Sequence, residues 1–325
     1  MRILVTGVTG QIGGALLPRL QGLRVEGLRV EGLPVEGLPV ESLATTLAAD
    51  RAVLDLSMPQ AIPSTLDRLT PDIIVNPAAY TAVDKAEDEP ELAMRVNAQA
   101  PGVIARWAAA RHVPLIHFST DYVFDGSGER AWREDDSPHP LSAYGASKLA
   151  GEDEVRAAGG TYLIVRTSWV YAAAGKNFLR TIARLARERA ELRIVADQIG
   201  APTSAALIAD TIARILSDGI ESLRARCLQS GGLIHVAAAG ETSWHGFACA
   251  IVEGLRERGI RLTVERVAPI STDQYPAKAP RPLNSRLDLM RLQSVFGITP
   301  PHWQEALSLE LDRLAAEFGT ATDRG

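Results

Sequence analysis

Short apolar runs alternate along the chain with longer stretches of helical periodicity. The apolar runs are RILVTG (2–7), DIIVNPAA (72–79), VPLIHFST (113–120), TYLIVRTSWVY (161–171) and LIHVAAAG (233–240). Such runs are typical of strands buried on both faces, whereas 91–110 and 142–157 have a helical pattern. This alternation predicts an α/β fold, a doubly wound, Rossmann-like parallel sheet with helices on both faces.

The alternation becomes less regular after about residue 170. The segment YPAKAPRPLN (275–284) predicts a loop, and a last helix is expected near 302–317. We therefore predict two domains. Residues 1–170 and about 204–239 form a dinucleotide-binding domain. Residues from about 171 to 203 and 240 to 325 form a smaller, partly interleaved substrate-binding domain.

The composition is that of an ordinary globular protein, with 46% hydrophobic and 22% charged residues. The net charge of −5, without any basic block, makes nucleic acid an unsuitable partner. Two cysteines and six scattered histidines predict neither a disulfide framework nor a metal site. Without an apolar run of membrane-spanning length or a leader pattern, we expect a cytoplasmic protein with a small-molecule ligand and no membrane partner, as a monomer or homodimer.

A glycine-rich turn follows the first predicted strand and opens the first helix, in TGVTGQIG (6–13). Gly7 permits a tight turn, Gly10 lets the backbone approach a pyrophosphate, and Gly13 lets helix and strand pack closely. Gln11 and Ile12 complete the first helical turn, whose free N–H groups attract negative charge. In this strand–turn–helix context the pattern predicts dinucleotide binding, although glycines alone are common in turns.

An acidic residue is expected about 20 residues further on, at the end of the second strand. The candidate, Asp50, lies 37 residues past Gly13, but residues 22–41 repeat GLRVE, GLRVE, GLPVE and GLPVE. Without these twenty residues the gap is 17, so we interpret the repeat as an insertion between the first helix and the second strand. A period of five matches neither helix nor strand, and we predict a loop remote from catalysis and dispensable for it.

Asp50 and the adjacent Arg51 bear on the choice of cofactor. An Asp favours the free ribose hydroxyls of NAD, whereas the adjacent Arg51 can pair with the extra phosphate of NADP. The pair predicts NADPH as cofactor, with NADH possible. Asp55 is either a contact to the adenine edge or a simple turn carboxylate.

The segment SAYGASKLAGE (142–152) places Tyr144 and Lys148 four residues apart, after the plausible helix N-cap Ser142. Residues at i and i+4 share a helix face, so we expect the Lys ammonium to lower the pKa of the phenol and Tyr144 to act as general acid. Thr120, at the end of an apolar run, is placed to hydrogen-bond the same substrate oxygen. Each feature alone has a structural explanation, as an exposed helix face or a strand-terminating Thr.

The glycine loop, Thr120 and the Tyr-x-x-x-Lys pair together resemble the extended short-chain dehydrogenase/reductase superfamily. Eight segments strongly resemble the dTDP-4-dehydrorhamnose reductase family and run in order from residue 76 to 288. They are NPAAYTAVDKAE, STDYVFDG, YGASKLAGE, VRTSWVY, GKNFLRT, DQIGAPT, GETSWHGFA and RPLNSRLD.

The resemblance implies roles for residues of this chain. Thr120, Tyr144 and Lys148 would be catalytic, and Ala78, Ala79 and Tyr80 would join the cofactor-binding residues, as would Tyr144 and Lys148. Asp121, Tyr122 and Trp169 would face the sugar, together with Thr120. Asn177, the segment 197–203 and Arg281 would shape the nucleotide-diphosphate side.

Three features depart from the family pattern. Pro77 stands where the family usually has Ala, and the pentapeptide repeat is foreign to the family. Some members bind Mg²⁺ through an acidic residue just after the GAPT segment, where this chain has Ala205 and Ala206. We therefore expect no metal.

The resemblance implies reduction of the C4 ketone of dTDP-4-dehydro-L-rhamnose to dTDP-L-rhamnose with NAD(P)H, for surface polysaccharide. Related dehydratases have an Asp-Glu pair where this chain has Asp121-Tyr122, which disfavours elimination. A sister reductase of another dTDP-4-keto-6-deoxy sugar remains an alternative. So does a non-catalytic NADP-binding regulatory subunit, although the intact Thr120, Tyr144 and Lys148 disfavour it.

Overall fold

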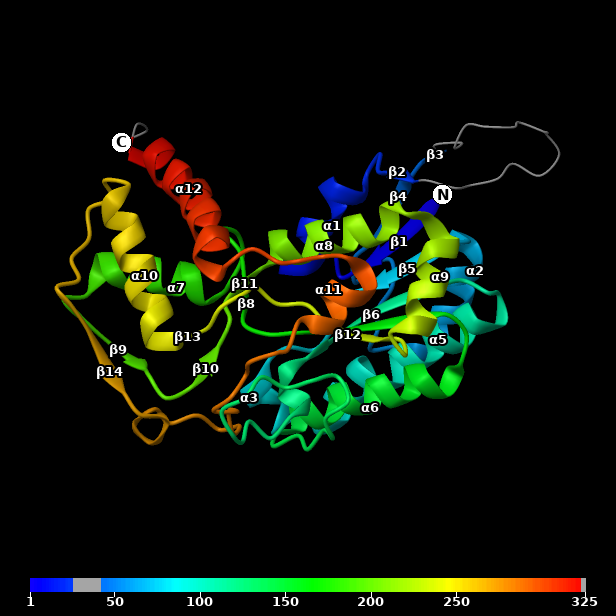
Figure 1. The fold of residues 1–325 in the computed structure, drawn as a ribbon, viewed down its shortest axis with the longest axis horizontal. Coiled ribbons are helices and arrows are strands. Elements are labelled where there is room, and N and C mark those ends of the chain that lie inside the picture. Colours follow the sequence, from blue (N-terminus) through cyan, green and yellow to red (C-terminus); the bar gives the residue numbers. More distant parts are fainter. Residues whose placement is uncertain (26–41, 323–325) are drawn as a thin grey trace.

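Six parallel strands form the central sheet of the computed structural model, which describes residues 1–25 and 42–322 (Figure 1). In spatial order the strands are β12 (Leu233–His235), β7 (Tyr162–Thr167), β6 (Leu115–Thr120), β5 (Ile73–Asn76), β1 (Arg2–Thr6) and β4 (Thr45–Ala49). From β1 the chain first builds outward to β4 and then in the other direction from β5 to β12. This reversal leaves a crevice between the carboxyl ends of β1 and β5, where ligands of open α/β sheets bind. The predicted doubly wound, Rossmann-like fold is confirmed.

Alternate residues of each strand face opposite layers of helices. In β1, Ile3 and Val5 pack into one buried cluster, whereas Leu4 packs into another. Helices α1 (Gln11–Leu20), α8 (Ala205–Ser217) and α9 (Gly219–Gln229) contribute to the first cluster. Helices α2 (Ile62–Leu69), α5 (Ala100–Ala110) and α6 (Ala143–Ala158) contribute to the second. Apolar residues on both faces of every strand therefore produce the continuous apolar runs seen in the sequence.

The segment before α5 is irregular, and its last two elements run into α5 without a break. It comprises α3 (Val83–Ala86), α4 (Pro90–Met94) and the π-helical turn η2 (Arg95–Gln99). Single π-helical turns of this kind are frequent at functional sites. This one packs against α6, because a Cβ on Gly151 would lie 2.0 Å from the carbonyl oxygen of Asn97.

The chain leaves the sheet after β7 and again after β12, and most of these two excursions lies together on the left of Figure 1, whereas residues 290–296 lie beside β12. The first contains β8 (Val170–Tyr171), α7 (Phe178–Glu188), β9 (Glu191–Val195), β10 (Ile199–Gly200) and β11 (Thr203–Ser204). The second contains β13 (Thr242–Ser243), α10 (Trp244–Glu257), β14 (Arg266–Ile270), α11 (Met290–Phe296) and α12 (Trp303–Thr322). Strand β9 pairs with β14 and β10 with β13, so the two excursions are joined by strand pairing. The division into two domains stays a prediction. Within the described residues, no helix is long and apolar enough to cross a membrane.

Both ends of the pentapeptide repeat meet in a short antiparallel ladder. Strand β2 (Arg24–Val25) pairs with β3 (Ser42–Leu43), with Val25 opposite Ser42. The prediction for residues 26–41 themselves lies outside the described residues. The ladder adjoins the first residues of β1, because the Thr45 N–H donates to the Met1 carbonyl at 2.8 Å. Residues 24–25 and 42–43, on either side of residues 26–41, therefore lie at the amino edge of the sheet, opposite the crevice.

Because Val25 and Ser42 are paired, residues 26–41 should be replaceable by a two-residue Asn-Gly turn, which closes an antiparallel ladder without strain. We expect the shortened protein to fold with a Tm within about 4 °C of the full chain, a change of under about 1 kcal/mol. Its NADPH dissociation constant, measured by isothermal titration, should be unchanged. Loss of NADPH binding in a folded variant would show that the repeat takes part in cofactor binding.

Candidate active site

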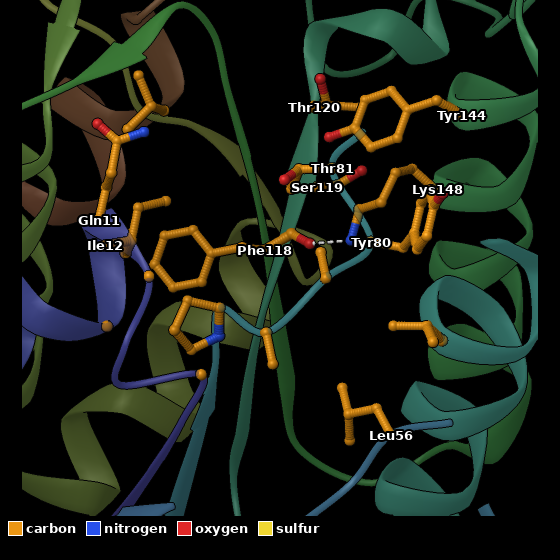
Figure 2. A pocket seen from close by; sticks show the side chains of 18 of the residues that line it. Gln11, Ile12, Leu56, Tyr80, Thr81, Phe118, Ser119, Thr120, Tyr144 and Lys148 are labelled. Atoms are coloured by element: carbon orange, nitrogen blue, oxygen red, sulfur yellow. Dashed lines mark hydrogen bonds between the residues drawn. The ribbon is translucent and has the colours of Figure 1, made fainter. Parts of the chain in front are cut away.

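A cavity of about 710 Å³ opens at the carboxyl ends of β1, β5 and β6 (Figure 2). It is lined by most of the residues that the sequence singled out, which come from segments far apart in the chain. These are Gly7, Gly10, Gln11, Ile12, Gly13, Asp50, Arg51, Asp55, Ala78, Ala79, Tyr80, Thr120, Asp121, Tyr122, Tyr144, Lys148 and Trp169.

The glycine loop lies directly against the end of β5. Gly7 has a φ of +57°, and a Cβ on it would lie 2.8 Å from the Ala78 Cα atom. A Cβ on Gly13 would lie 2.3 Å from the Gly7 carbonyl oxygen, so helix α1 could not approach the loop with any other residue there. Helix α1 begins at Gln11 without a side-chain cap or an acidic residue in its first turn. Its free N–H groups therefore suit the pyrophosphate of a dinucleotide.

The end of the cavity beside β4 carries Asp50 and Arg51, which were predicted to choose the cofactor, and Asp55. Asp50 follows β4 directly, and its Oδ1 accepts hydrogen bonds from Ala52 N at 2.9 Å and Val53 N at 3.0 Å. The Arg51 side chain is 80% exposed and contacts only Asp55, at 3.2 Å, among the contacts of the described residues. Burial raises the pKa of Asp55, but hydrogen bonds from Ser57 and Arg51 outweigh it and hold that pKa below its ordinary value. Arg51 is thus a loosely held cation at the cavity edge.

Tyr144 and Lys148 lie one helical turn apart at the start of α6, as predicted. Ser142 caps the helix by accepting a hydrogen bond from Gly145 N at 3.1 Å. Tyr144 lies beside Thr120, and its hydroxyl points toward that residue, at the end of β6 (Figure 2). The helix cap and the strand end therefore bring the three predicted catalytic side chains to one wall of the cavity.

The charge of Lys148 does not offset the effect of burial on the pKa of the phenol in this arrangement. Burial raises the pKa of Tyr144 well above its ordinary value, and the negative charge of Asp121 adds to this, while a hydrogen bond with Thr120 acts in the opposite direction. The Lys148 ammonium is instead directed at the Phe118 carbonyl oxygen, 2.6 Å from Nζ. Tyr144 is therefore protonated at neutral pH, the state required of a proton donor.

Lys148 is itself 2% exposed, and burial lowers its pKa to about 8, against the attraction of Glu152. Glu152 is fully buried and forms two hydrogen bonds with Arg166, at 2.8 and 2.7 Å. Arg156 contacts the same carboxylate at 2.7 Å. Because two guanidinium groups neutralise Glu152, its attraction for the Lys148 ammonium is weakened.

Asp121 and Tyr122 follow Thr120 in the single turn η3 (Asp121–Val123). The Thr120 hydroxyl donates to Asp121 Oδ1 at 3.0 Å, and Tyr122 N donates to Thr120 Oγ1 at 3.2 Å. Burial raises the pKa of Asp121 to about 6, despite hydrogen bonds with Ser285 and Thr120. The hydroxyl of Thr120 is thus oriented by both of its neighbours.

Two stacked indoles form another part of the cavity wall. Trp169 stacks on Trp244 with ring centroids 3.7 Å apart and planes inclined by 13°. The φ of Trp169 is +49°, a strained backbone conformation for a residue with a side chain. A Cβ on Gly200 would lie 2.8 Å from the Trp169 ring, and Gln198 accepts a hydrogen bond from Trp244 Nε1 at 3.1 Å. The segment 197–203, predicted to contact the nucleotide, instead holds the two indoles, and no residue of it is among those lining the cavity.

Asn177 and Arg281 are not among the residues lining the cavity, and their roles in substrate binding stay a prediction. Asn177 caps α7, and its Nδ2 donates to the Ala172 carbonyl oxygen at 2.8 Å. Arg281 pairs with Asp84 at 2.8 Å. Lys176 and Trp244, for which the sequence analysis predicted no role, line the cavity. Both lie in segments already singled out, GKNFLRT and GETSWHGFA, but the tertiary structure was needed to place them.

Asn97, in the π-helical turn η2, fixes the loop after β5. Its Oδ1 accepts from Tyr80 N at 2.8 Å, and its Nδ2 donates to the Tyr80 carbonyl oxygen at 3.0 Å and to Ser147 Oγ at 3.0 Å. Asn97 therefore ties the Ala78–Tyr80 segment to α6, next to Lys148. Among the described residues, no group of three or more His, Cys, Asp or Glu side chains is arranged to hold a metal ion.

Comparison with known proteins identifies one family over nearly the whole chain. The family described as RmlD substrate binding domain matches residues 1–316. A dTDP-4-dehydrorhamnose reductase of Burkholderia thailandensis is 45% identical over 313 residues, which are 95% of this chain and 97% of that protein. A solved dTDP-4-dehydrorhamnose reductase of Clostridium acetobutylicum has a TM-score of 0.80 and 32% identity, covering 97% of this chain and 99% of that one. A solved dTDP-4-dehydrorhamnose reductase of Bacillus anthracis, in complex with NADP, has a TM-score of 0.76 and 33% identity with the same coverage.

The raised pKa of Asp121 predicts that its ionisation destabilises the fold. The folded protein binds the proton of Asp121 more tightly than the unfolded chain does. The contribution of Asp121 to the free energy of unfolding is therefore fully present below pH 3.8 and is lost as the pH rises through about 6. A difference of about two pKa units corresponds to about 3 kcal/mol at most. We expect Asp121→Asn to increase the free energy of unfolding at pH 7, by an amount that shrinks toward pH 4.

Urea denaturation at several pH values measures this effect. Asp125→Asn is the matched control, because hydrogen bonds from Ser127 lower the pKa of Asp125 and its pH dependence should have the opposite sign. An Asp121→Asn variant that is less stable than wild type at pH 7, or whose stability difference does not depend on pH, would contradict the assignment.

Proposed function

The chain belongs to the family described as RmlD substrate binding domain, and from this membership we propose that it reduces the C4 ketone of dTDP-4-dehydro-L-rhamnose to dTDP-L-rhamnose with NAD(P)H. The observation that carries the proposal is the convergence of Thr120, Tyr144 and Lys148 on a cavity that also contains the glycine loop. A carbonyl group placed at this wall would meet a proton donor, a second hydroxyl and a cation together.

Bound NADPH supplies the hydride for this reaction. The glycine loop and the uncapped start of α1 bind its pyrophosphate, and the loosely held Arg51 is available for a 2′-phosphate. The Asp50 carboxylate already accepts two backbone hydrogen bonds through Oδ1, which supports a preference for NADPH with NADH accepted. The NADP bound to the B. anthracis relative supports the same choice.

Tyr144 donates its phenolic proton to the C4 oxygen as the carbon receives hydride, so that the ketone becomes a neutral alcohol and the phenol a phenolate. Thr120 transfers its single hydroxyl hydrogen bond from Asp121 Oδ1, which accepts it in the structure, to the same substrate oxygen and so stabilises the negative charge that develops there. The Lys148 ammonium, whose pKa is about 8, stabilises the phenolate and favours the return of a proton to it. Asp121 orients Thr120, and the two indoles bound the sugar on the opposite side.

The product would enter surface polysaccharide synthesis, in the cytoplasm where nucleotide sugars and NADPH are made. Whether the protein works as a monomer or a homodimer stays a prediction.

The sister-reductase alternative concerns only the shape of the sugar pocket around Trp169 and Tyr122. A panel of dTDP-4-keto-6-deoxy sugars, with NADPH consumption and product identity as readouts, distinguishes it. A regulatory subunit would bind NADPH and consume none with any sugar of the panel.

Tyr144→Phe removes the proton donor and leaves the ring in place. We expect NADPH affinity to stay within about threefold and turnover to fall by at least ~100-fold, since general acid catalysis contributes about 10²–10⁴ in rate. Isothermal titration and the fall in nicotinamide absorbance measure the two quantities. Near-normal turnover would exclude Tyr144 as the proton donor.

Lys176 and Arg281 offer a test of which cation faces the diphosphate of the sugar nucleotide. Lys176 lines the cavity, whereas Arg281 is paired with Asp84. We expect Lys176→Gln to raise the KM for the nucleotide sugar about tenfold, the loss of one charge-assisted contact, and to leave kcat nearly unchanged. Arg281→Gln serves as the control with little effect on KM. A larger effect of Arg281→Gln than of Lys176→Gln on the KM would show that Arg281 binds the diphosphate, as the family resemblance implies.

A further inference from the structure

Behind the cavity wall, a row of buried polar side chains crosses the carboxyl end of the sheet. Thr6, Asn76 and His117 are the neighbouring residues of β1, β5 and β6 in this row, at most 1% exposed. Each lies two residues after Leu4, Ile74 or Leu115 in its strand and so faces the same side of the sheet. Those three residues pack toward α2, α5 and α6. None of the three polar residues is among the residues that line the cavity. The row ends at Lys148, which does line the cavity. It therefore connects the interior of the protein with the predicted catalytic lysine.

Short contacts join the four side chains in sequence. Thr6 Oγ1 donates to Asn76 Oδ1 at 2.6 Å, and Asn76 Nδ2 lies 3.1 Å from His117 Nδ1. His117 Nε2 lies 3.5 Å from Lys148 Nζ. The ammonium has a second, shorter contact to the Phe118 carbonyl oxygen, at 2.6 Å.

The orientation of the Asn76 amide sets the positions of the protons. Its Oδ1 accepts from Thr6 Oγ1, which itself accepts from Ala78 N at 3.3 Å, and its Nδ2 faces the imidazole. With the amide in this orientation, Nδ1 of His117 accepts and the ring proton lies on Nε2. Burial, together with the nearby Lys148 charge, lowers the pKa of His117 well below its ordinary value, so the ring is neutral. An N–H group therefore faces the nitrogen of Lys148.

Few charged groups act on Lys148 from its other sides. On its own helix, Tyr144 is a neutral phenol and Glu152 is neutralised by Arg166 and Arg156. From the strand-end turn, Asp121 carries a charge above about pH 6. The fixed Nε2–H of His117 disfavours the ammonium relative to the amine, which can accept a hydrogen bond from it.

We propose that His117 is a positioning residue for Lys148: Thr6 and Asn76 hold its imidazole with Nε2–H toward Nζ, which fixes the lysine nitrogen and makes its proton easier to release. The value of this arrangement for catalysis rests on the proposed function, in which Lys148 favours the return of a proton to Tyr144. A proton source with a pKa near the working pH serves that purpose better than an ordinary lysine.

Titration of Lys148 in the cofactor-free protein tests the proposal without reference to activity. The chain has four lysines, Lys85, Lys148, Lys176 and Lys278, so ¹³C,¹⁵N-lysine labelling gives few signals, assigned with Lys148→Met. Wild-type Lys148 should titrate near pH 8. In His117→Leu the opposing N–H is gone, and we expect the pKa of Lys148 to rise by about half a unit or more.

Two further variants keep the test decisive. Thr6→Val preserves side-chain shape but frees the Asn76 amide to turn, so that Nε2 can become an acceptor for the ammonium. Thr6→Val should raise the pKa of Lys148, as His117→Leu does. If His117→Leu does not fold, Thr6→Val alone tests the role of His117. His235→Leu is the matched control, since His235 is also fully buried at the end of a sheet strand, β12, and should leave the Lys148 titration unchanged.

The alkaline limb of the kcat/KM profile for keto-sugar reduction should move upward by the same amount in the folded His117→Leu and Thr6→Val variants. An unchanged or lowered pKa of Lys148 in these variants would overturn the role of His117, even if the wild-type enzyme reduces the sugar. Absence of reduction by the wild-type enzyme would overturn the proposed function and leave the titration result standing.

Discussion

Burial of the Lys148 ammonium at the end of the sheet is the constraint on which the site depends. An isolated buried cation costs several kcal/mol, so its surroundings must accept its hydrogen bonds or lower its charge. The Phe118 carbonyl oxygen does the first, at 2.6 Å, and the lowered pKa of about 8 reflects the second. Glu152 could neutralise the ammonium, but Arg166 and Arg156 occupy its carboxylate. The lysine is thus left poised between two protonation states next to Tyr144.

The same burial explains why Tyr144 is suited to reduction. Removal of water raises the pKa of the phenol, so the group keeps its proton until a developing alkoxide takes it. The side chain of Asp121 adds negative charge and also orients Thr120. One physical effect, desolvation, therefore lowers the pKa of the cation and raises that of the phenol, which moves the two pKa values further apart than in water.

The scaffold keeps these groups in place through close backbone packing at the switch point of the sheet. Gly7 and Gly13 allow the first helix, the loop and the end of β5 to touch. On the far side, the strained Trp169 and its partner Trp244 are held by Gly200 and Gln198 from the first excursion of the chain. The cavity thus lies between a rigid cofactor loop and an aromatic wall built from segments remote in sequence.

The sequence by itself determined the features that depend on local spacing. Strand and helix alternation gave the fold class, the glycine spacing gave the loop, and the i, i+4 relation placed Tyr144 and Lys148 on one helix face. Only the tertiary structure decided features that depend on partners from other segments. Arg281 has the character of a diphosphate ligand, but only the folded structure shows that it pairs with Asp84 and that its charge acts on Tyr122. His117 lies within an apolar run and became part of the site only because sheet register sets it beside Asn76. Register and burial are properties of the folded chain, and no local pattern encodes which distant side chain will be the neighbour.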